Sequence, residues 1–218
     1  MKSLRPIATG ILLIAGLPVL LSAAPSAQTS KAAAKSAPAA DNALCATCHG
    51  ANGEGSAAAH VPRIAGQSAE YLQKQLDDYA SGARDNAIMA NFAKALSAGQ
   101  REEFSKRYAA MSAPFLPEAA PSQKQLARGH QLAYQGDETL RVQACNACHG
   151  PDGSGVLHAA PYLAGQSSEY IGTALKAFQS GLRKNDAGEL MRSVAARLAD
   201  ADITAAAAYF ASEGPATR

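Results

Sequence analysis

The sequence predicts an all-α protein that consists of two tandem homologous domains. The main observation is an internal repeat, because "PRIAGQSAEYLQKQLDDYASGAR" at residues 62–84 matches "PYLAGQSSEYIGTALKAFQSGLR" at residues 161–183. Apolar residues in both copies recur with the spacing of an amphipathic helix, and no strand-like alternation of any length occurs. The abundant alanine also favours helices, whereas aromatic residues make up only 6% of the chain.

The residues before the repeat predict export. Lys2 and Arg5 precede an apolar run from Ile7 to Leu21, and small residues follow, which is the layout of a secretory signal. An uncleaved N-terminal anchor is the alternative, although the run is short for a membrane span. We expect a signal at 1–27, a flexible tether at 28–41, a first domain at 42–115, a linker at 116–122 and a second domain at 123–218.

Capping residues place the expected helices. Serine at the N-cap, a serine–glutamine capping box and glycine at the C-terminus are the signals that mark their ends. We expect helices from Ser68 to Gly82, from Ser167 to Gly181, from Ser97 through Met111, over about residues 123–135, and from Asp200 onward. No equally clear helix precedes the first cysteine.

The charge of the chain argues against nucleic-acid binding. Two of the 20 Lys/Arg residues lie in the expected signal, so the remaining 18 balance the 18 Asp/Glu residues. The basic stripe that is typical of nucleic-acid binders is absent from the sequence. We therefore expect no nucleic-acid partner.

All four cysteines lie in two Cys-x-x-Cys-His motifs, "CATCHGANGEG" at residues 45–55 and "CNACHGPDGSG" at residues 145–155. This motif is the attachment signature of c-type haem, in which two thiols form thioethers with the haem vinyl groups and the histidine binds the iron. The expected sites are Cys45, Cys48 and His49 for one covalent haem c, and Cys145, Cys148 and His149 for the other.

Paired cysteines have three other common uses. A disulfide in each pair leaves the repeated histidine unexplained. A zinc site needs four ligands, and each repeat offers few others. A thioredoxin-like redox pair needs a βαβ context that the sequence lacks. Two copies of the motif in matching domains therefore favour two haems.

The second axial ligand of each iron decides between carrier and enzyme. Met89 follows His49 by 40 residues and Met191 follows His149 by 42, so a methionine repeats at one position of a methionine-poor chain. We interpret these two as ligands, with a core methionine as the alternative. His60 and His158 are rival ligands that do not align between the repeats, and Met111 is interpreted as core.

Further residues repeat around the expected haems. Pro62 and Pro161 follow the histidines, and their carbonyl groups are candidate acceptors for the second imidazole N–H, although a simple loop turn is equally possible. Arg84 and Arg183 are candidates to neutralise haem propionates, with a solvated helix-end arginine as the alternative. The glycines after each motif would let the chain turn close to the ring.

These motifs, the two Pro-x-x-Ala-Gly-Gln segments and the two methionines resemble the dihaem class I cytochromes c of the cytochrome c4 family, over about residues 42–214. The resemblance implies two small helical cytochrome c domains with neighbouring haems. It maps the axial residues onto His49 with Met89 and onto His149 with Met191. It also implies a periplasmic, often membrane-associated carrier that passes electrons toward a terminal oxidase.

The function expected from the sequence is electron transfer. A six-coordinate iron has no place for a substrate, so the chain would carry one electron per haem. The resemblance implies a respiratory donor, a terminal oxidase as the acceptor, and a periplasmic location with possible peripheral membrane association. One alternative is a cytochrome subunit of a dehydrogenase or oxidase complex. Another is a dihaem peroxidase, for which no acid–base group is evident.

Overall fold

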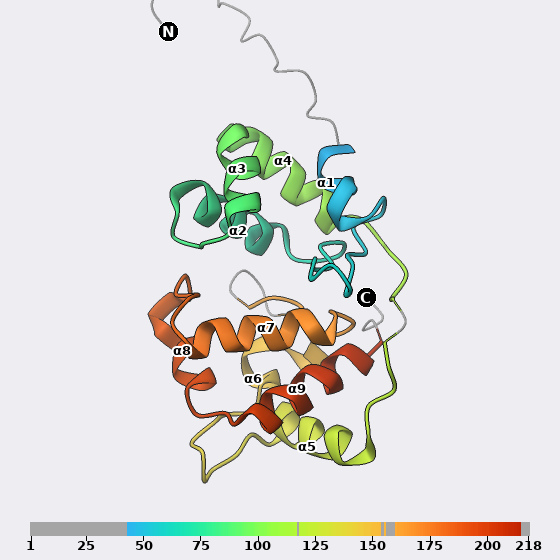
Figure 1. The fold of residues 1–218 in the computed structure, drawn as a ribbon, viewed down its shortest axis with the longest axis vertical. Helices are drawn as coiled ribbons and strands as arrows, with labels where there is room; N and C mark the ends of the chain where they lie inside the picture. The colour runs from blue at the N-terminus through green and yellow to red at the C-terminus, as the bar shows by residue number, and fades with distance from the viewer. Residues whose placement is uncertain (1–42, 117, 154, 156–159, 215–218) are drawn as a thin grey trace, which may run out of the picture. The chain divides into compact units, whose positions relative to one another are not determined.

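The computed structural model describes residues 43–116, 118–153, 155 and 160–214. We call residues 43–115 the first half and residues 123–214 the second half. The first half contains α1 (Ala43–His49), α2 (Ala69–Ser81), α3 (Ala87–Ala95) and α4 (Ala98–Ala109) (Figure 1). The second half contains α5 (Gln123–Tyr134), α6 (Asn146–His149), η1 (Pro151–Gly153), α7 (Ser168–Gln179), η2 (Ala187–Glu189), α8 (Leu190–Ala195) and α9 (Asp200–Ser212). The all-α prediction is confirmed, since strand pairing among the described residues is limited to isolated bridges.

The helices of the first half begin at the predicted caps. The Ser68 side chain accepts a hydrogen bond from the Tyr71 backbone, and α2 ends at Gly82 with a left-handed φ of 82°. Ser97 and Gln100 form the capping box expected for α4. The α2 helix packs against both α3 and α4, so these three helices form the body of this half.

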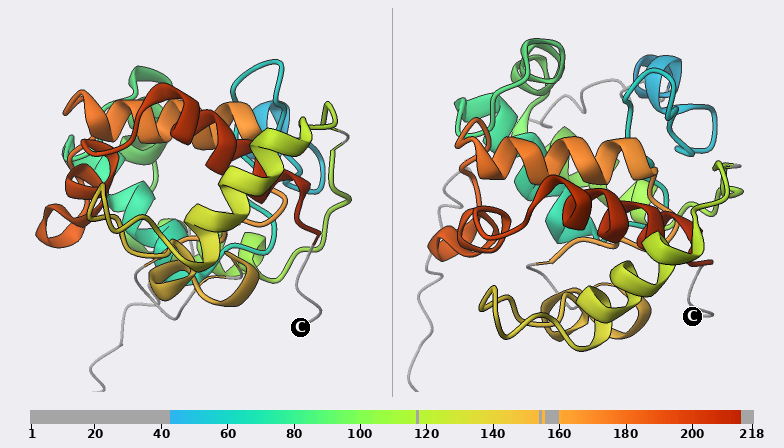
Figure 2. Two further views of the ribbon diagram at one scale, coloured as in Figure 1. Left: turned by 90° about the horizontal axis from the view of Figure 1, so that it is seen from below. Right: turned by 60° about the horizontal axis from the view of Figure 1, so that its bottom comes forward.

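The second half repeats this plan and adds α5. Ser167 caps α7 as Ser68 caps α2, and Ser122 caps α5. The α5 and α9 helices cross and pack closely, as both views of Figure 2 show. At the crossing, a Cβ on Gly129 would lie 2.3 Å from the Cβ of Tyr209, so only glycine allows this approach.

Two predicted helix ends are wrong. The α4 helix ends at Ala109, so Met111 follows the helix rather than lying on it. The last helix has Ala199 as its N-cap, and Asp200 is its first residue. The Asp202 carboxylate, in the third position of the helix, accepts the N–H of the N-cap residue Ala199 at 3.1 Å.

The end of the first half and the linker both contact the second half. The Phe115 ring lies under the guanidinium of Arg63 at 4.3 Å, and a Cβ on Gly165 would lie 1.4 Å from that ring. Glu118 accepts hydrogen bonds from the backbone and the hydroxyl of Ser168 at 3.2 and 2.6 Å. Both halves belong to one compact unit, and the domain boundaries stay a prediction.

Some predictions concern residues outside this description. The signal, the tether and His158 lie outside the described residues. Within the described part of the chain, no helix is long and apolar enough to cross a membrane.

Candidate functional site

A short helix carries all or most of each Cys-x-x-Cys-His motif. The α1 helix carries the first motif entire, and α6 begins directly after Cys145. Gly50 and Gly150 follow the histidines with φ of 82° and 80°, a backbone conformation that ends both helices. All four cysteines are free thiols, which leaves them available for thioether bonds.

The structure brings each histidine to the proline that the sequence singled out. Nδ1 of His49 lies 2.9 Å from the Pro62 carbonyl oxygen, and Nδ1 of His149 lies 2.9 Å from that of Pro161. A carbonyl only accepts, so Nδ1 carries the proton in both rings. Burial lowers the pKa of His49 and of His149, and the bond to proline opposes this only in part.

Both imidazoles are therefore neutral, with the lone pair on Nε2. Among the described residues, neither Nε2 has a hydrogen-bond partner. A neutral imidazole that is fixed through Nδ1 and free at Nε2 is the form that binds a metal.

Burial favours the protonated form of the first thiol in each motif. Burial raises the pKa of Cys45, although the neighbouring Tyr108 hydroxyl and the charge of Arg107 lower it in part. Burial raises the pKa of Cys145 to about 11. The paired thiols and the adjacent imidazoles together fit a covalently attached haem in each half.

The loop after each motif packs closely against the last helix of its own half. A Cβ on Gly53 would lie 2.9 Å from the Tyr108 ring, and a Cβ on Gly153 would lie 2.9 Å from the Phe210 ring. Both glycines also have positive φ. They therefore serve the close turn that we expected beside the haem.

The two methionines lie at the start of corresponding helices. Met89 is the third residue of α3 and donates its backbone N–H to Asn86, the N-cap, at 2.9 Å. Met191 is the second residue of α8, where the Asp186 carboxylate accepts from the backbone and the side chain of Arg192, both at 2.9 Å. Both side chains are half-buried, and they lie on different elements from the histidines.

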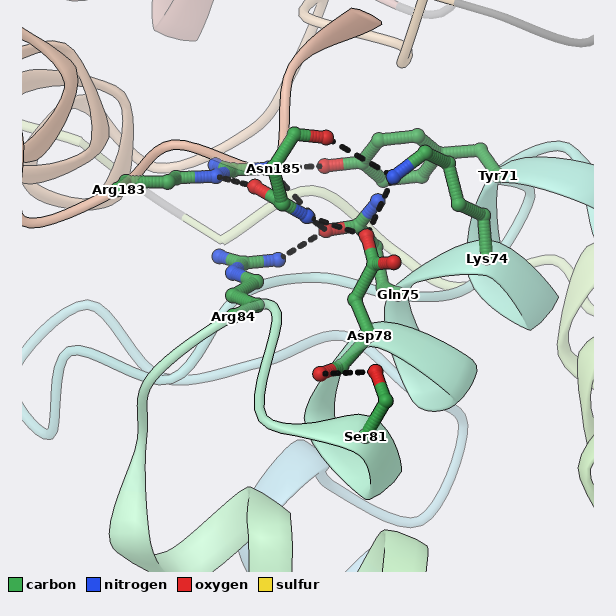
Figure 3. A network of polar contacts seen from close by, with 8 residues as sticks. All are labelled: Tyr71, Lys74, Gln75, Asp78, Ser81, Arg84, Arg183 and Asn185. Atoms are coloured by element: carbon green, nitrogen blue, oxygen red, sulfur yellow. Dashed lines mark hydrogen bonds and ion pairs between the residues drawn. The ribbon is translucent and has the colours of Figure 1, made fainter.

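Arg84 and Arg183 each extend from one half to contact the other, and both lie in the polar network of Figure 3. Arg84 donates to the hydroxyl of Tyr170 at 2.9 Å, and Arg183 donates to the hydroxyl of Tyr71 at 3.2 Å. Gln75 Oε1 also accepts from Arg84 at 2.7 Å and from Arg183 at 3.2 Å. Each arginine thus contacts a tyrosine of the opposite half.

The positive charges of Arg84 and Arg183 are not balanced by a carboxylate among the described residues. Among the described residues, neither Arg84 nor Arg183 forms an ion pair, although Arg84 is only 9% exposed. Burial by itself would raise the pKa of Tyr170, but both guanidinium groups outweigh it and hold that pKa below its ordinary value. A buried cation without an acidic partner fits an anionic group such as a haem propionate.

Sequence reasoning missed two glutamines. Gln67 and Gln166 occupy the same place in the repeat, five residues after Pro62 and Pro161, and both are buried. The repetition was visible in the Ala-Gly-Gln segments. No local pattern shows that each glutamine contacts the opposite half, as described below.

Comparisons with known proteins show the family to which the chain belongs. The cytochrome c family matches the chain twice, at residues 33–116 and 126–213. Cytochrome c4 of Azotobacter vinelandii is 35% identical over 175 residues, which are 77% of this chain and 83% of that protein. The chain belongs to the dihaem cytochrome c4 family. The crystal structure of cytochrome c4 from Pseudomonas stutzeri matches the chain with a TM-score of 0.73 and 29% identity. The match covers 79% of this chain and 95% of that one.

Two other similar proteins bear on thiosulfate. A thiosulfate dehydrogenase electron acceptor of Stutzerimonas stutzeri is 45% identical to this chain over 170 residues. The aligned residues are 78% of this chain and 79% of that protein. A thiosulfate dehydrogenase structure from Marichromatium purpuratum has a TM-score of 0.72 and 37% identity. The match covers 78% of this chain but only 36% of that one.

Membership of this family confirms several expectations. The chain is an electron-transfer protein rather than an enzyme, it carries two covalent haem c groups, and it works with redox partners. The prediction of two tandem cytochrome c domains is also confirmed.

Proposed function

We propose that this protein accepts electrons from a thiosulfate dehydrogenase and passes them to a respiratory acceptor. The 45% identity to a thiosulfate dehydrogenase electron acceptor carries the proposal. The thiosulfate dehydrogenase of known structure supports it, because about a third of that chain resembles this one. A carrier segment within the enzyme's own chain indicates that such a donor and such an acceptor work in direct contact.

The proposed haem attachments are the thiols of the two motifs, and the proposed axial pairs are His49 with Met89 and His149 with Met191. Each bound haem supplies reversible one-electron chemistry at its iron. The chain holds the imidazoles neutral and fixed through Pro62 and Pro161. Methionine ligation would raise the potential and close the sixth position to substrates.

The proposed partners of the haem propionates are Arg84 and Arg183. Each guanidinium has five N–H donors, and the described bonds leave some of them unused. Their position between the halves would bring the anionic edges of both haems to one place.

A reduction experiment tests the donor. The oxidised holoprotein is mixed with a purified thiosulfate dehydrogenase and thiosulfate, and the absorbance of ferrous haem is followed. We expect catalytic reduction of both haems, much faster than that of mitochondrial cytochrome c under the same conditions. Equal rates for the two acceptors would contradict a dedicated pairing.

Delivery to a terminal oxidase is a second candidate, favoured by the 35% identity to cytochrome c4. The reduced holoprotein would then be oxidised by membranes that contain such an oxidase, in a cyanide-sensitive reaction. The same cell fractionation tests a periplasmic location and peripheral membrane association, because the holoprotein should be released by osmotic shock or by a salt wash. Mass spectrometry of the released protein shows whether the signal is cleaved.

The axial methionines are tested one at a time. Met89→Ala and Met191→Ala should each remove half of the near-infrared charge-transfer absorption from methionine sulfur to ferric iron. Met111→Leu is the matched control, since Met111 lies after α4 and has no methionine at its place in the second half. A variant of Met89 or Met191 with the full absorption would show that its ligand is another residue.

A further inference from the structure

Two buried glutamines make equivalent contacts across the two halves. Gln67 is 6% exposed and Gln166 is 5% exposed. Gln166 binds the backbone of Arg63 in the first half, and Gln67 binds the backbone of Tyr162 in the second. The contacts are therefore reciprocal between the halves.

Each glutamine satisfies both polar groups of one residue. The Oε1 atom of Gln166 accepts the Arg63 N–H at 2.9 Å, and its Nε2 donates to the Arg63 carbonyl at 2.9 Å. The Oε1 atom of Gln67 accepts the Tyr162 N–H at 3.0 Å, and its Nε2 donates to the Tyr162 carbonyl at 2.8 Å. A backbone N–H only donates and a carbonyl only accepts, so the orientation of both side-chain amides is fixed.

The bound N–H groups belong to the peptide groups that hold the histidines. The Arg63 nitrogen and the Pro62 carbonyl form one peptide group, and that carbonyl accepts from Nδ1 of His49. The Tyr162 nitrogen and the Pro161 carbonyl are paired in the same way beneath His149. One planar peptide group thus links a glutamine of one half to the histidine of the other.

Resonance in the peptide group couples its N–H and its carbonyl electronically. When an amide N–H donates to an acceptor, electron density moves toward the carbonyl oxygen of the same group, which becomes a stronger acceptor. A stronger acceptor draws the Nδ1 proton away and makes the imidazole more electron-rich. An electron-rich axial imidazole stabilises ferric over ferrous iron.

Close packing holds the first of these peptide groups in place. A Cβ on Gly55 would lie 2.5 Å from the Arg63 nitrogen and 2.6 Å from the Pro62 carbonyl carbon. The guanidinium of Arg63 is fixed as well, because it donates to the Ala113 and Pro114 carbonyls at 2.7 and 2.8 Å. The peptide group can therefore transmit a change at Gln166 without moving away from it.

We propose that Gln166 and Gln67 are positioning residues for the haem of the opposite half. Gln166 sets the hydrogen bond from His49 to Pro62, and Gln67 sets the bond from His149 to Pro161. Each haem potential then depends on a side chain of the other half. This inference rests on the proposed ligation of iron by His49 and His149.

The test uses Gln166→Met and Gln67→Met in the full-length holoprotein. Methionine has a similar volume and leaves the peptide N–H without its acceptor. Without polarisation, Gln166→Met should shift the reduction equilibrium of the haem at His49 about twofold to fivefold toward the ferrous form and leave the other haem unchanged. Gln67→Met should do the reverse.

Two measurements read this crossed pattern. A redox titration that is monitored by NMR of the haem methyl groups gives the reduction equilibrium of each haem separately. Each methyl signal is assigned to its haem through contacts with residues of that haem's own half. In the reduced protein, the Nδ1 proton of the affected histidine should move upfield as its hydrogen bond weakens. Gln166→Asn, which shortens the side chain by one methylene, gives a milder version of the same shift if the methionine variant yields no holoprotein.

Glu118→Gln is the matched control, because Glu118 joins the linker to Ser168 but contacts neither peptide group. The Glu118→Gln variant should leave the reduction equilibrium of both haems unchanged. The inference is overturned if each glutamine variant shifts both haems alike, shifts the haem of its own half, or shifts neither. A low-spin spectrum that persists in such a variant would show that the ligation stands while the inference fails.

Discussion

The two halves of the molecule agree around the cysteine motifs and differ in what surrounds them. Both fix the histidine on a proline carbonyl, both turn through glycines after the motif, and both use a glutamine of the opposite half. The second half adds the crossing of α5 with α9. Only the first half places Gln75 in the contact between halves, since Ala174 stands at that point of the second repeat.

This difference separates two roles. The shared contacts are those that hold an imidazole neutral and fixed, which both haems need. The contacts that differ concern stability and the joining of the halves, which one side alone can supply. We therefore expect changes in the unshared contacts to alter stability unequally, while both haem sites tolerate them.

The largest effect is expected at the helix crossing of the second half. In Gly129→Val, the new side chain would meet the Cβ of Tyr209 at 2.3 Å and the carbonyl oxygen of Ala205 at 2.4 Å. Because backbone cannot move aside cheaply, the free energy of unfolding should fall by about 3 kcal/mol. Thermal unfolding of the holoprotein, followed by circular dichroism, measures the loss.

Gly99→Val in α4 of the first half is the matched control. A Cβ there would have no neighbour within 4 Å, and the helix propensity of valine is slightly higher than that of glycine, so the free energy of unfolding should change by less than about 1 kcal/mol. Similar losses in the two variants would mean that the α5–α9 crossing does not distinguish the halves.

The next largest effect is expected at Gln75, a shared acceptor that only the first half supplies. Gln75→Leu removes an acceptor shared by Arg84 at 2.7 Å, Asn185 at 3.0 Å and Arg183 at 3.2 Å. Leaving buried charged donors unsatisfied should cost about 2 kcal/mol of unfolding free energy. Chemical denaturation measures this change.

Gln123→Leu, at an exposed position of α5, is the control and should change stability by less than about 0.5 kcal/mol. If the Gln75 variant is no less stable than this control, the network does not hold the halves together, and the asymmetry between them is smaller than the structure indicates.

Local signals in the sequence predicted most of the fold. The caps at Ser68, Ser97 and Ser167 were correct because a serine side chain and the backbone N–H three residues on decide a helix start between them. The end of α4 was missed because a distant contact marks it. The Tyr108 carbonyl accepts a hydrogen bond from the Gly66 N–H at 3.0 Å. The residues near Met111 give no sequence signal for this distant contact.

The same distinction applies to the candidate site. The motifs and the prolines repeat in the sequence, so their grouping around each histidine could be predicted from spacing and chemistry. The exchange of Arg84, Arg183 and the two glutamines between halves could not, because a repeat shows which positions are equivalent but not which half each one contacts.

Acid should weaken the second half through Asp137. Hydrogen bonds from Thr139 and Arg128, and then from the Leu140 N–H, lower the pKa of Asp137 to about 2. Its folded pKa lies below the unfolded value, so its contribution to stability is present above about pH 4 and is lost as the pH falls toward 2. Unfolding of wild type and Asp137→Asn across that range should show a shallower acid slope in the variant. Parallel slopes would assign the acid sensitivity to other carboxylates.

The smallest effect is expected where the halves differ by one hydroxyl. Tyr108 and Phe210 are equivalent, since their carbonyls accept from Gly66 and Gly165 at 3.0 and 2.9 Å. The Tyr108 hydroxyl is buried without an oxygen or nitrogen partner among the described residues, and the Cys45 sulfur beside it is a weak acceptor.

Tyr108→Phe should therefore raise the free energy of unfolding by up to about 1 kcal/mol, because it removes a polar group whose burial is not compensated. Phe210→Tyr, the reciprocal change, should lower it by about 1 kcal/mol, since Phe210 is only 1% exposed and the new hydroxyl would be buried in turn. Denaturation of both holoproteins measures the pair. A loss of stability in Tyr108→Phe would mean that the hydroxyl is satisfied in the holoprotein, with the haem or a bound water as its partner, and that this side of the first haem differs chemically from the second.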